Sequence, residues 1–153
     1  MKLSEDKNLD APVTNVMDHN VVILDDSASI NEVARTMEEN GVTSILVRDS
    51  ESGAVSGIVT ERDIIYRAVA KSLGMYKAKI KKIMTTPVIT VDKQTSCIEA
   101  IKIMREKSLR RLPVLEQGKI IGVVTLMSLA GNVPERNIDL VELEKPQTSE
   151  TPI

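Results

Sequence analysis

The chain has 153 residues and a formal net charge of −2; 42% of its residues are hydrophobic, 27% are charged, and two tyrosines are the only aromatic side chains. The length suits one domain or two very small ones. No segment resembles a secretory signal or the ~18 apolar residues of a membrane span, so we expect a cytoplasmic protein. One cysteine (Cys97) and one histidine (His19) exclude a disulfide framework and argue against any metal site, and the lack of Phe and Trp disfavours base stacking on single-stranded nucleic acid.

The first half of the chain alternates short apolar runs with an amphipathic helix. After a polar tail over residues 1–12, the run Val21–Leu24 predicts a strand. Apolar residues at 30, 33, 34 and 37 then recur with helical spacing, and Gly41 is placed to end that helix. Two β-rich segments and a second helix follow, at Thr43–Arg48, Ala54–Val59 and Arg62–Leu73.

The second half predicts the same order of elements. They are a strand at Val88–Val91, a helix with apolar residues 97, 100, 101 and 104, strands at Arg111–Leu115 and Lys119–Val124, and a short helix at Ser128–Ala130. Both longer helices begin with Ser-x-x-Glu, at Ser29 and Ser96, which is the capping-box pattern. Residues 134–153 form an acidic tail, in which Ile138–Leu143 is a candidate edge strand.

These two halves are copies of one repeat. An offset of 67 residues aligns eight identical residues between positions 17 and 48, among them Met17 with Met84 and Ser29 with Ser96. Beyond residue 48 the offset falls to 65, which aligns Gly57 with Gly122 and Thr60 with Thr125. One repeat is too small to bury a comfortable core alone, so the two copies are expected to pack against each other.

Three segments carry a resemblance to a known family. They read Met-Thr-Thr-Pro-Val-Ile-Thr-Val at 84–91, Arg-Arg-Leu-Pro-Val at 110–114 and Gly-Ile-Val-Thr-Glu-Arg-Asp at 57–63. With the repeat, they make residues 13–133 resemble the CBS domain family, in which a tandem pair is called a Bateman module. The resemblance implies an α+β fold of two β-α-β-β-α domains, 13–74 and 83–133, joined by a basic linker at 75–82 and facing each other around a pseudo-two-fold axis.

The segment 57–63 also has a chemical interpretation of its own. Thr60 stands at a predicted helix start, where free N–H groups attract phosphate, and an ionised Asp63 offers two acceptor oxygens to the hydroxyls of a ribose. Thr-x-x-Asp is equally a capping box that only caps the start of a helix, with Thr60 as the N-cap, and the residues alone do not separate the two interpretations. In the family, this motif binds ribose and phosphate.

The resemblance extends the site to residues outside that motif. It implies that Ile58, Thr86, Pro87 and Ile89 surround the adenine, that Arg110 and Arg111 face the phosphates, and that Pro113 closes the pocket. Without the resemblance, the Arg pair is read as a solvated strand end in preference to a phosphate site. A second, pseudo-symmetric site is expected to be weak or empty, because Ser128 replaces the carboxylate and the opposite wall has no Arg; its residues are Val22, Thr43, Ser44, Leu46, Thr125 and Ser128.

The resemblance therefore predicts a regulatory module that binds AMP, ADP or ATP in a cleft between two domains, relays the ligand's level to a partner and forms a homodimer. S-adenosylmethionine and NAD are less favoured ligands. No activated nucleophile, paired acids or metal cluster suggests an enzyme. The alternative is binding of RNA or tRNA, because residues 61–120 carry 14 basic and 6 acidic residues, a net +8, whereas the rest of the chain carries −10.

Overall fold

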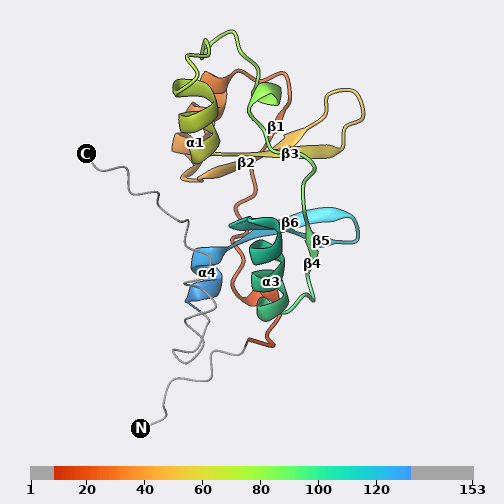
Figure 1. The fold of residues 1–153 in the computed structure, drawn as a ribbon. Helices are drawn as coiled ribbons and strands as arrows, with labels where there is room; N and C mark the ends of the chain where they lie inside the picture. The colour runs from red at the N-terminus through yellow and green to blue at the C-terminus, as the bar shows by residue number, and fades with distance from the viewer. Residues whose placement is uncertain (1–8, 132–153) are drawn as a thin grey trace, which may run out of the picture. The chain divides into compact units, whose positions relative to one another are not determined.

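The computed structural model describes residues 9–131, which divide into two compact units (Figure 1). The first unit comprises residues 20–89, and the described part of the second unit comprises residues 9–19 and 90–131. The acidic tail at 134–153, with its candidate strand at Ile138–Leu143, and residues 1–8 lie outside the described residues. The fold is α+β with two tandem repeats, as the sequence predicts.

The first unit contains a three-stranded sheet in the order β1-β2-β3. Strand β1 (Ile23–Asp25) is parallel to β2 (Ser44–Arg48), and β3 (Val55–Thr60) is antiparallel to β2. The sequence predicts β2 and β3 to within a residue. Strand β1 begins later than the apolar run at 21–24, because its pairing with β2 covers only residues 23–25.

Helix α1 (Ile30–Asn40) begins and ends where the sequence places its signals. The hydroxyl of Ser29, the N-cap, accepts a hydrogen bond from the N–H of Glu32 at 3.1 Å. Gly41 follows the helix with φ of 63°, a left-handed conformation that glycine adopts without steric cost. The apolar stripe is narrower than the spacing predicts, because Ala34 is exposed.

The helix after β3 differs from the prediction of a regular helix over Arg62–Leu73. It begins one residue earlier as α2 (Glu61–Asp63) and continues as a π-helix, η2 (Ile64–Val69). The N–H of Ala70 donates to the carbonyl of Ile65 at 2.9 Å, five residues back. Ser72 then takes a left-handed φ of 55°, which a right-handed helix cannot contain.

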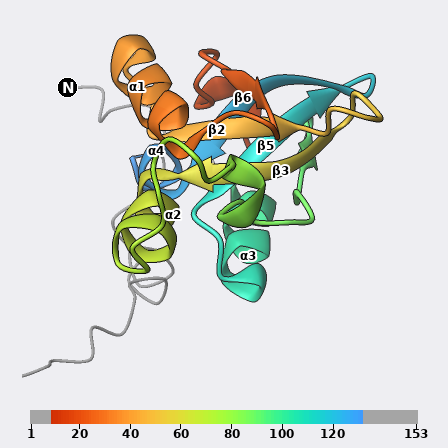
Figure 2. The ribbon, with the colours of Figure 1, turned by 90° about the horizontal axis from the view of Figure 1, so that it is seen from above.

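The core of the first unit lies between its sheet and the helices on one face. Figure 1 shows α1 and α2 on the same side of β2 and β3, and Figure 2 shows them from above. The buried residues come from α1 and the residue two before it, from η2, from the sheet and from the 75–83 segment; they are Ala28, Ile30, Val33, Met37, Ile45, Val47, Val59, Ala68, Ala78, Ile80 and Ile83. The amphipathic helix and the alternating strands of the sequence thus meet at one apolar layer.

The second unit repeats this architecture with its own sheet in the order β4-β5-β6. Its elements are β4 (Val91–Asp92), α3 (Cys97–Lys107), β5 (Arg111–Glu116), β6 (Lys119–Thr125) and α4 (Leu126–Ala130). Ser96 and Glu99 form the full capping box at the start of α3. Cys97 is fully buried, as its place on the apolar stripe predicts, and His19 is exposed.

The segment that opens each repeat lies in the unit that holds the strands of the other repeat. Residues 13–18, with the 3-10 helix η1 (Val13–Asn15), pair with β6 through two hydrogen bonds of 2.9 Å between Asp18 and Val123. Residues 80–85, with the 3-10 helix η3 (Ile80–Lys82), pair with β3 at Ile58. The compact units therefore divide the chain differently from the ranges 13–74 and 83–133.

Residues 75–82, predicted as a basic linker, are packed into the first unit. The carbonyls of Met75 and Ala78 accept hydrogen bonds from the first N–H groups of α1, at 2.9 and 3.2 Å. In the second unit, the carbonyls of Leu9 and Ala11 accept from the first N–H groups of α3, at 3.0 and 2.8 Å. Each segment satisfies backbone donors that a helix start leaves unpaired.

Candidate functional site

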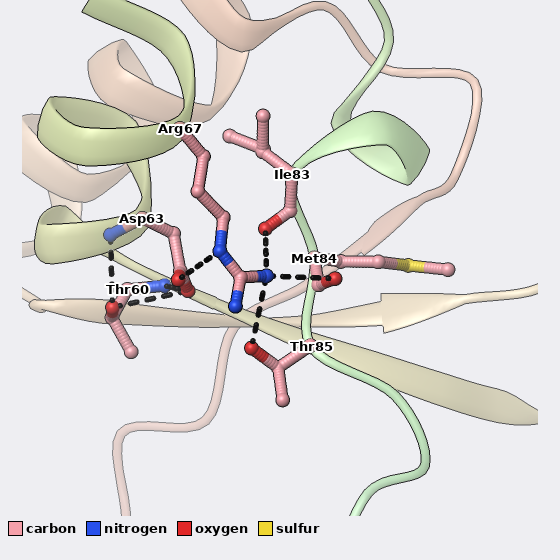
Figure 3. Close-up of polar contacts among 6 residues, drawn as sticks. All are labelled: Thr60, Asp63, Arg67, Ile83, Met84 and Thr85. Atoms are coloured by element: carbon pink, nitrogen blue, oxygen red, sulfur yellow. Dashed lines mark hydrogen bonds and ion pairs between the residues drawn. The ribbon is translucent and has the colours of Figure 1, made fainter. Parts of the chain in front are cut away.

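The turn from β3 into α2 holds the two residues predicted to bind ribose and phosphate. Thr60 is the N-cap of α2, and its hydroxyl accepts a hydrogen bond from the N–H of Asp63 at 3.3 Å. In return, Oδ2 of Asp63 accepts from the N–H of Thr60 at 2.9 Å and from its hydroxyl at 3.1 Å (Figure 3). The capping box is therefore formed in full, so these side chains serve the local fold whether or not a ligand binds.

The start of α2 offers fewer free donors than the sequence suggests. The N–H of Glu61 donates to the carbonyl of Thr43 at 3.2 Å, and the N–H of Asp63 donates to Thr60. Two of the N–H groups that could hold a phosphate here are thus already engaged. Any phosphate charge would have to be met mainly by cationic side chains.

Asp63 has a second partner that the sequence analysis misses. Nε of Arg67, one turn further along the helix, lies 3.5 Å from Oδ1 of Asp63. The carboxylate is 13% exposed and the Arg67 side chain 50% exposed, so the pair lies at the edge of the unit. The spacing of four residues between acid and base was the available signal for this contact.

Arg67 also reaches the segment that opens the second repeat. Its NH1 group donates to the carbonyls of Ile83 at 3.1 Å and Met84 at 3.4 Å, and to the hydroxyl of Thr85 at 3.4 Å (Figure 3). Thr85 in turn exchanges two backbone hydrogen bonds with Ile58 of β3, at 2.8 and 3.1 Å. Residues 83–85 are therefore held by β3 through their backbone and by the helix through Arg67.

The structure places the residues predicted to surround adenine in this same unit. Ile58 and Ile89 are half-buried, and Thr86 and Pro87, joined by a cis peptide bond, are exposed. The pairing of Ile58 with Thr85 brings the start of the Thr86–Pro87 segment beside β3, one residue beyond the hydrogen bonds. Ile58, Thr60, Asp63 and this segment thus lie on adjoining parts of one unit.

Gly57 allows the close approach of this segment to β3. A Cβ atom at Gly57 would lie 2.5 Å from Sδ of Met84 and 3.0 Å from its Cγ. Real Cβ contacts are not that short, so any larger residue would force the Met84 side chain to move. The glycine of the motif is therefore explained by packing inside the unit.

The remaining predicted residues lie in the second unit. Arg111 is half-buried and opens β5, where it pairs with Thr125, whereas Arg110 is exposed and accepts a hydrogen bond at its carbonyl from the N–H of Leu126 at 2.8 Å. Pro113 is buried in β5. The role of these three residues beside Asp63 stays a prediction.

The second predicted site is divided in the same way. Thr125 and Ser128 form the turn from β6 into α4, where each residue's N–H donates to the other's hydroxyl at 3.1 Å. The other four residues, Val22, Thr43, Ser44 and Leu46, belong to the first unit. At this turn the capping box is present without a carboxylate.

Comparisons with known proteins settle the family. The family model of the CBS domain matches the chain twice, at residues 13–70 and 80–135. The chain belongs to the CBS domain family. Pairs of CBS domains are generally regulatory modules that bind adenosyl ligands, and proteins built on them are generally not catalytic.

Solved structures share the fold of this CBS pair. A crystal structure of an uncharacterized conserved protein from Pyrococcus horikoshii is 31% identical, with a TM-score of 0.73, and the match covers 81% of this chain and 92% of that one. A CBS domain protein of unknown function from Thermoplasma acidophilum has a TM-score of 0.76 over 87% of this chain and 75% of its own; at 23% identity it supports the fold alone.

Relatives by sequence vary in length. An uncharacterized protein from Methanopyrus kandleri is 35% identical over 99 residues, which are 64% of this chain and 50% of that protein. The CBS domain-containing protein YhcV from Bacillus subtilis is 29% identical over 78% of this chain and 84% of its own. The CBS pair spans half of the Methanopyrus kandleri protein and 31% of a relative from Methanocaldococcus jannaschii.

The described residues also lack two features, a cluster of metal-binding side chains and a helix able to span a membrane. Within residues 9–131, no group of three or more His, Cys, Asp or Glu side chains could hold a metal ion. In the same part of the chain, every helix is too short or too polar to span a membrane.

Proposed function

We propose that this CBS pair binds an adenine nucleotide (AMP, ADP or ATP) through Asp63 and Thr60, and relays the ligand's level to a partner protein. S-adenosylmethionine and NAD are the less favoured ligands. The observation that carries the proposal is the state of the Asp63 carboxylate. A carboxylate oxygen can accept about two hydrogen bonds. Oδ2 already accepts two from Thr60, whereas among the described residues Oδ1 makes the 3.5 Å contact with Arg67 and keeps acceptor capacity for a ribose hydroxyl.

The matched turn of the second unit supports this interpretation. Ser128 completes a capping box with Thr125 without a charge, so folding of such a turn does not require a carboxylate. Asp63 therefore supplies something that the turn itself does not need. A charge-assisted hydrogen bond to a ribose hydroxyl is a use of that charge which fits the family.

Calorimetry with AMP, ADP, ATP, S-adenosylmethionine and NAD tests the proposal. We expect one of the adenine nucleotides to bind, and Asp63→Ser to weaken it by about 10- to 150-fold, because a hydrogen bond to a charged group contributes about 1.5–3 kcal/mol. The substitution copies the turn of the second unit, so the fold should persist, which circular dichroism would check. Ser128→Ala is the matched control and should bind as the wild type does.

Two results would contradict the proposal. Absence of heat with all five ligands, using folded protein, would exclude adenosyl binding by this chain. Unchanged affinity in the Asp63→Ser variant would mean that the protein binds the nucleotide but that Asp63 does not take part in binding it.

Homodimer formation is part of the proposal, since proteins with CBS pairs often form oligomers. Helix η2 exposes three apolar side chains, Ile65, Tyr66 and Val69, each more than half accessible. Such a group on one short helix supports a protein contact at this surface. Light scattering on the intact chain would measure the oligomeric state, with a monomer as the contrary result.

The RNA alternative has weaker support. The lysines at 77, 79, 81 and 82 are exposed, but exposed lysines are equally expected of an ordinary solvated surface. Steep loss of tRNA binding with rising salt would be its signature.

A further inference from the structure

We propose that Arg67 is a positioning residue, which fixes the Asp63 carboxylate relative to residues 83–85 and thereby sets the protein's preference for ribose over deoxyribose. This inference rests on the proposed function and deepens it. Arg67 does not have to touch the ligand for this role. It acts through Asp63 on one side and through the segment leading to Thr86 and Pro87 on the other.

The geometry of the guanidinium group is the first argument. Its Nε faces Oδ1 of Asp63 at 3.5 Å, and its NH1 faces three oxygens of residues 83–85 at 3.1 to 3.4 Å. The two nitrogens belong to one rigid plane, so the acid and the segment are held at a fixed separation. Figure 3 shows the guanidinium lying between the Asp63 carboxylate and the backbone of this segment.

The remaining restraints on each partner are the second argument. Among the described residues, Asp63 without Arg67 would keep the hydrogen bonds of Oδ2 with Thr60. The segment would keep the backbone pairing of Thr85 with Ile58, the bonds from the N–H groups of Ile83 and Met84 to the carbonyl of Ile80, and the buried Ile83 side chain. The carboxylate, and in particular Oδ1, would then gain the most freedom.

The expected consequence is a loss of selectivity as well as of affinity. If Oδ1 accepts a ribose hydroxyl, its direction decides how much that hydroxyl contributes to binding. A nucleotide that lacks the 2′-hydroxyl forfeits the contribution in the wild type. In a protein whose carboxylate is poorly oriented, this hydroxyl contributes less to binding. The ratio of the affinity for the ribose nucleotide to that for its 2′-deoxy analogue should therefore fall.

Calorimetry with AMP and ATP, each beside its 2′-deoxy analogue, measures this ratio. We expect the wild type to prefer the ribose form by about tenfold or more, the value of a hydrogen bond to a charged group. Arg67→Gln should reduce the ratio to within about threefold, because a hydrogen bond to a carboxylate whose direction is no longer fixed is weak. Arg67→Lys keeps the charge but not the planar fork, so its ratio should lie between the two.

Arg62→Gln is the matched control. Arg62 lies on the same helix, exposed, with its guanidinium 5.3 Å from the centre of the Tyr66 ring. Removal of this charge should leave the ribose preference unchanged. It separates the specific effect of Arg67 from a general loss of positive charge.

The outcomes distinguish this inference from the proposed function. Wild-type protein that binds none of AMP, ADP and ATP overturns nucleotide binding and this inference with it. A wild type that binds one of them but does not distinguish its deoxy form, or an Arg67→Gln protein that binds weakly with the wild-type ratio, overturns the role of Arg67 alone. If the Arg67→Gln protein is unfolded, the ratio of ribose to deoxyribose affinity is measured in Arg67→Lys, and a wild-type ratio there overturns the role of Arg67.

Discussion

The two units build the same strand-to-helix turn with different chemistry. In the first, Thr60 is paired with a carboxylate, and in the second, Thr125 is paired with the hydroxyl of Ser128. The hydroxyl of Ser128 also donates to the carbonyl of Thr125 at 2.9 Å, a bond that a carboxylate cannot make. The second turn thus satisfies its polar groups locally, whereas the first places a carboxylate oxygen, Oδ1 of Asp63, 3.5 Å from Nε of Arg67.

The comparison separates the needs of the fold from those of a ligand. Both turns meet the capping requirement, so selection for a helix start alone would be satisfied by serine at either position. An acid that is largely buried and tied to a cation on a different turn costs more to desolvate than a hydroxyl. Asp63 is therefore the residue of this turn whose function should be tested, because the cap alone does not require its charge.

The largest stability difference between the units should appear at their motif glycines. A Cβ at Gly122 would lie 2.9 Å from the backbone oxygen of Asp18 and 2.6 Å from Sδ of Met17, whereas the three atoms nearest to a Cβ at Gly57 all belong to the side chain of Met84. Backbone cannot move aside as a methionine side chain can. We expect Gly122→Ala to lower the free energy of unfolding by about 1–3 kcal/mol, and Gly57→Ala to lower it less, in urea titrations.

A second substitution sharpens this prediction. Met17→Ala should not rescue Gly122→Ala, because the Asp18 oxygen remains, whereas Met84→Ala should relieve the crowding at Gly57→Ala. If Gly122→Ala and Gly57→Ala lowered the free energy of unfolding equally, the segments packed against the two glycines would yield equally to an added methyl group. The predicted difference between the units would then be wrong.

The sequence predicts the elements well because their signals are local. Ser29 and Gly41 mark the ends of α1 through bonds to residues a turn away, and the apolar stripe follows from the helical repeat. The pairing of Asp18 with Val123 has no such signal, since it joins residues far apart in the chain. For this reason the repeat alone could not show which unit each opening segment belongs to.

In the site, too, the residues of a local motif were predictable and the residue with distant contacts was not. Thr60 and Asp63 belong to a recognisable motif, and the structure gives them the geometry of that motif. Arg67 was missed because most of its acceptors are backbone carbonyls, at Ile83 and Met84, and every residue carries such a group. An acid–base pair four residues apart is also a common surface feature, so the spacing alone carried little information.

The next contrast lies at a β-bulge that both units share. The register shift in β3 leaves Ser56 as the extra residue, and the shift in β6 leaves Ile121 in the equivalent place. The hydroxyl oxygen of Ser56 is buried without a hydrogen-bond partner among the described residues. Ser56→Ala should therefore raise the free energy of unfolding, by up to about 1 kcal/mol, because an unsatisfied buried hydroxyl is costly.

Urea titration beside a control measures this effect. Ser50→Ala, at an exposed turn of the same hairpin, should leave the free energy of unfolding unchanged. A clear loss of stability in Ser56→Ala would mean that the hydroxyl contributes a favourable interaction, and the bulge of the first unit would then need a different explanation.

The smallest expected difference concerns the hairpin turns. The second unit turns at Gln117 and Gly118, with left-handed φ angles of 49° and 76°. The first uses a carboxylate: Oδ1 of Asp49 accepts hydrogen bonds from the N–H groups of Ser52 at 2.7 Å and Glu51 at 2.9 Å. These donors, Ser52 first, hold the pKa of Asp49 below its ordinary value of 3.8.

Acid should therefore loosen the hairpin of the first unit in a defined way. Because the folded pKa of Asp49 is lowered, its stabilising effect is complete above pH 3.8 and is lost as the pH falls through the lowered value. The amide chemical shift of Ser52 should show an inflection below pH 3.8. Asp49→Asn keeps an oxygen acceptor without a titrating proton and should abolish that inflection. An inflection at or above the ordinary value would mean that the turn does not favour the ionised carboxylate, and the two hairpins would then respond to acid alike.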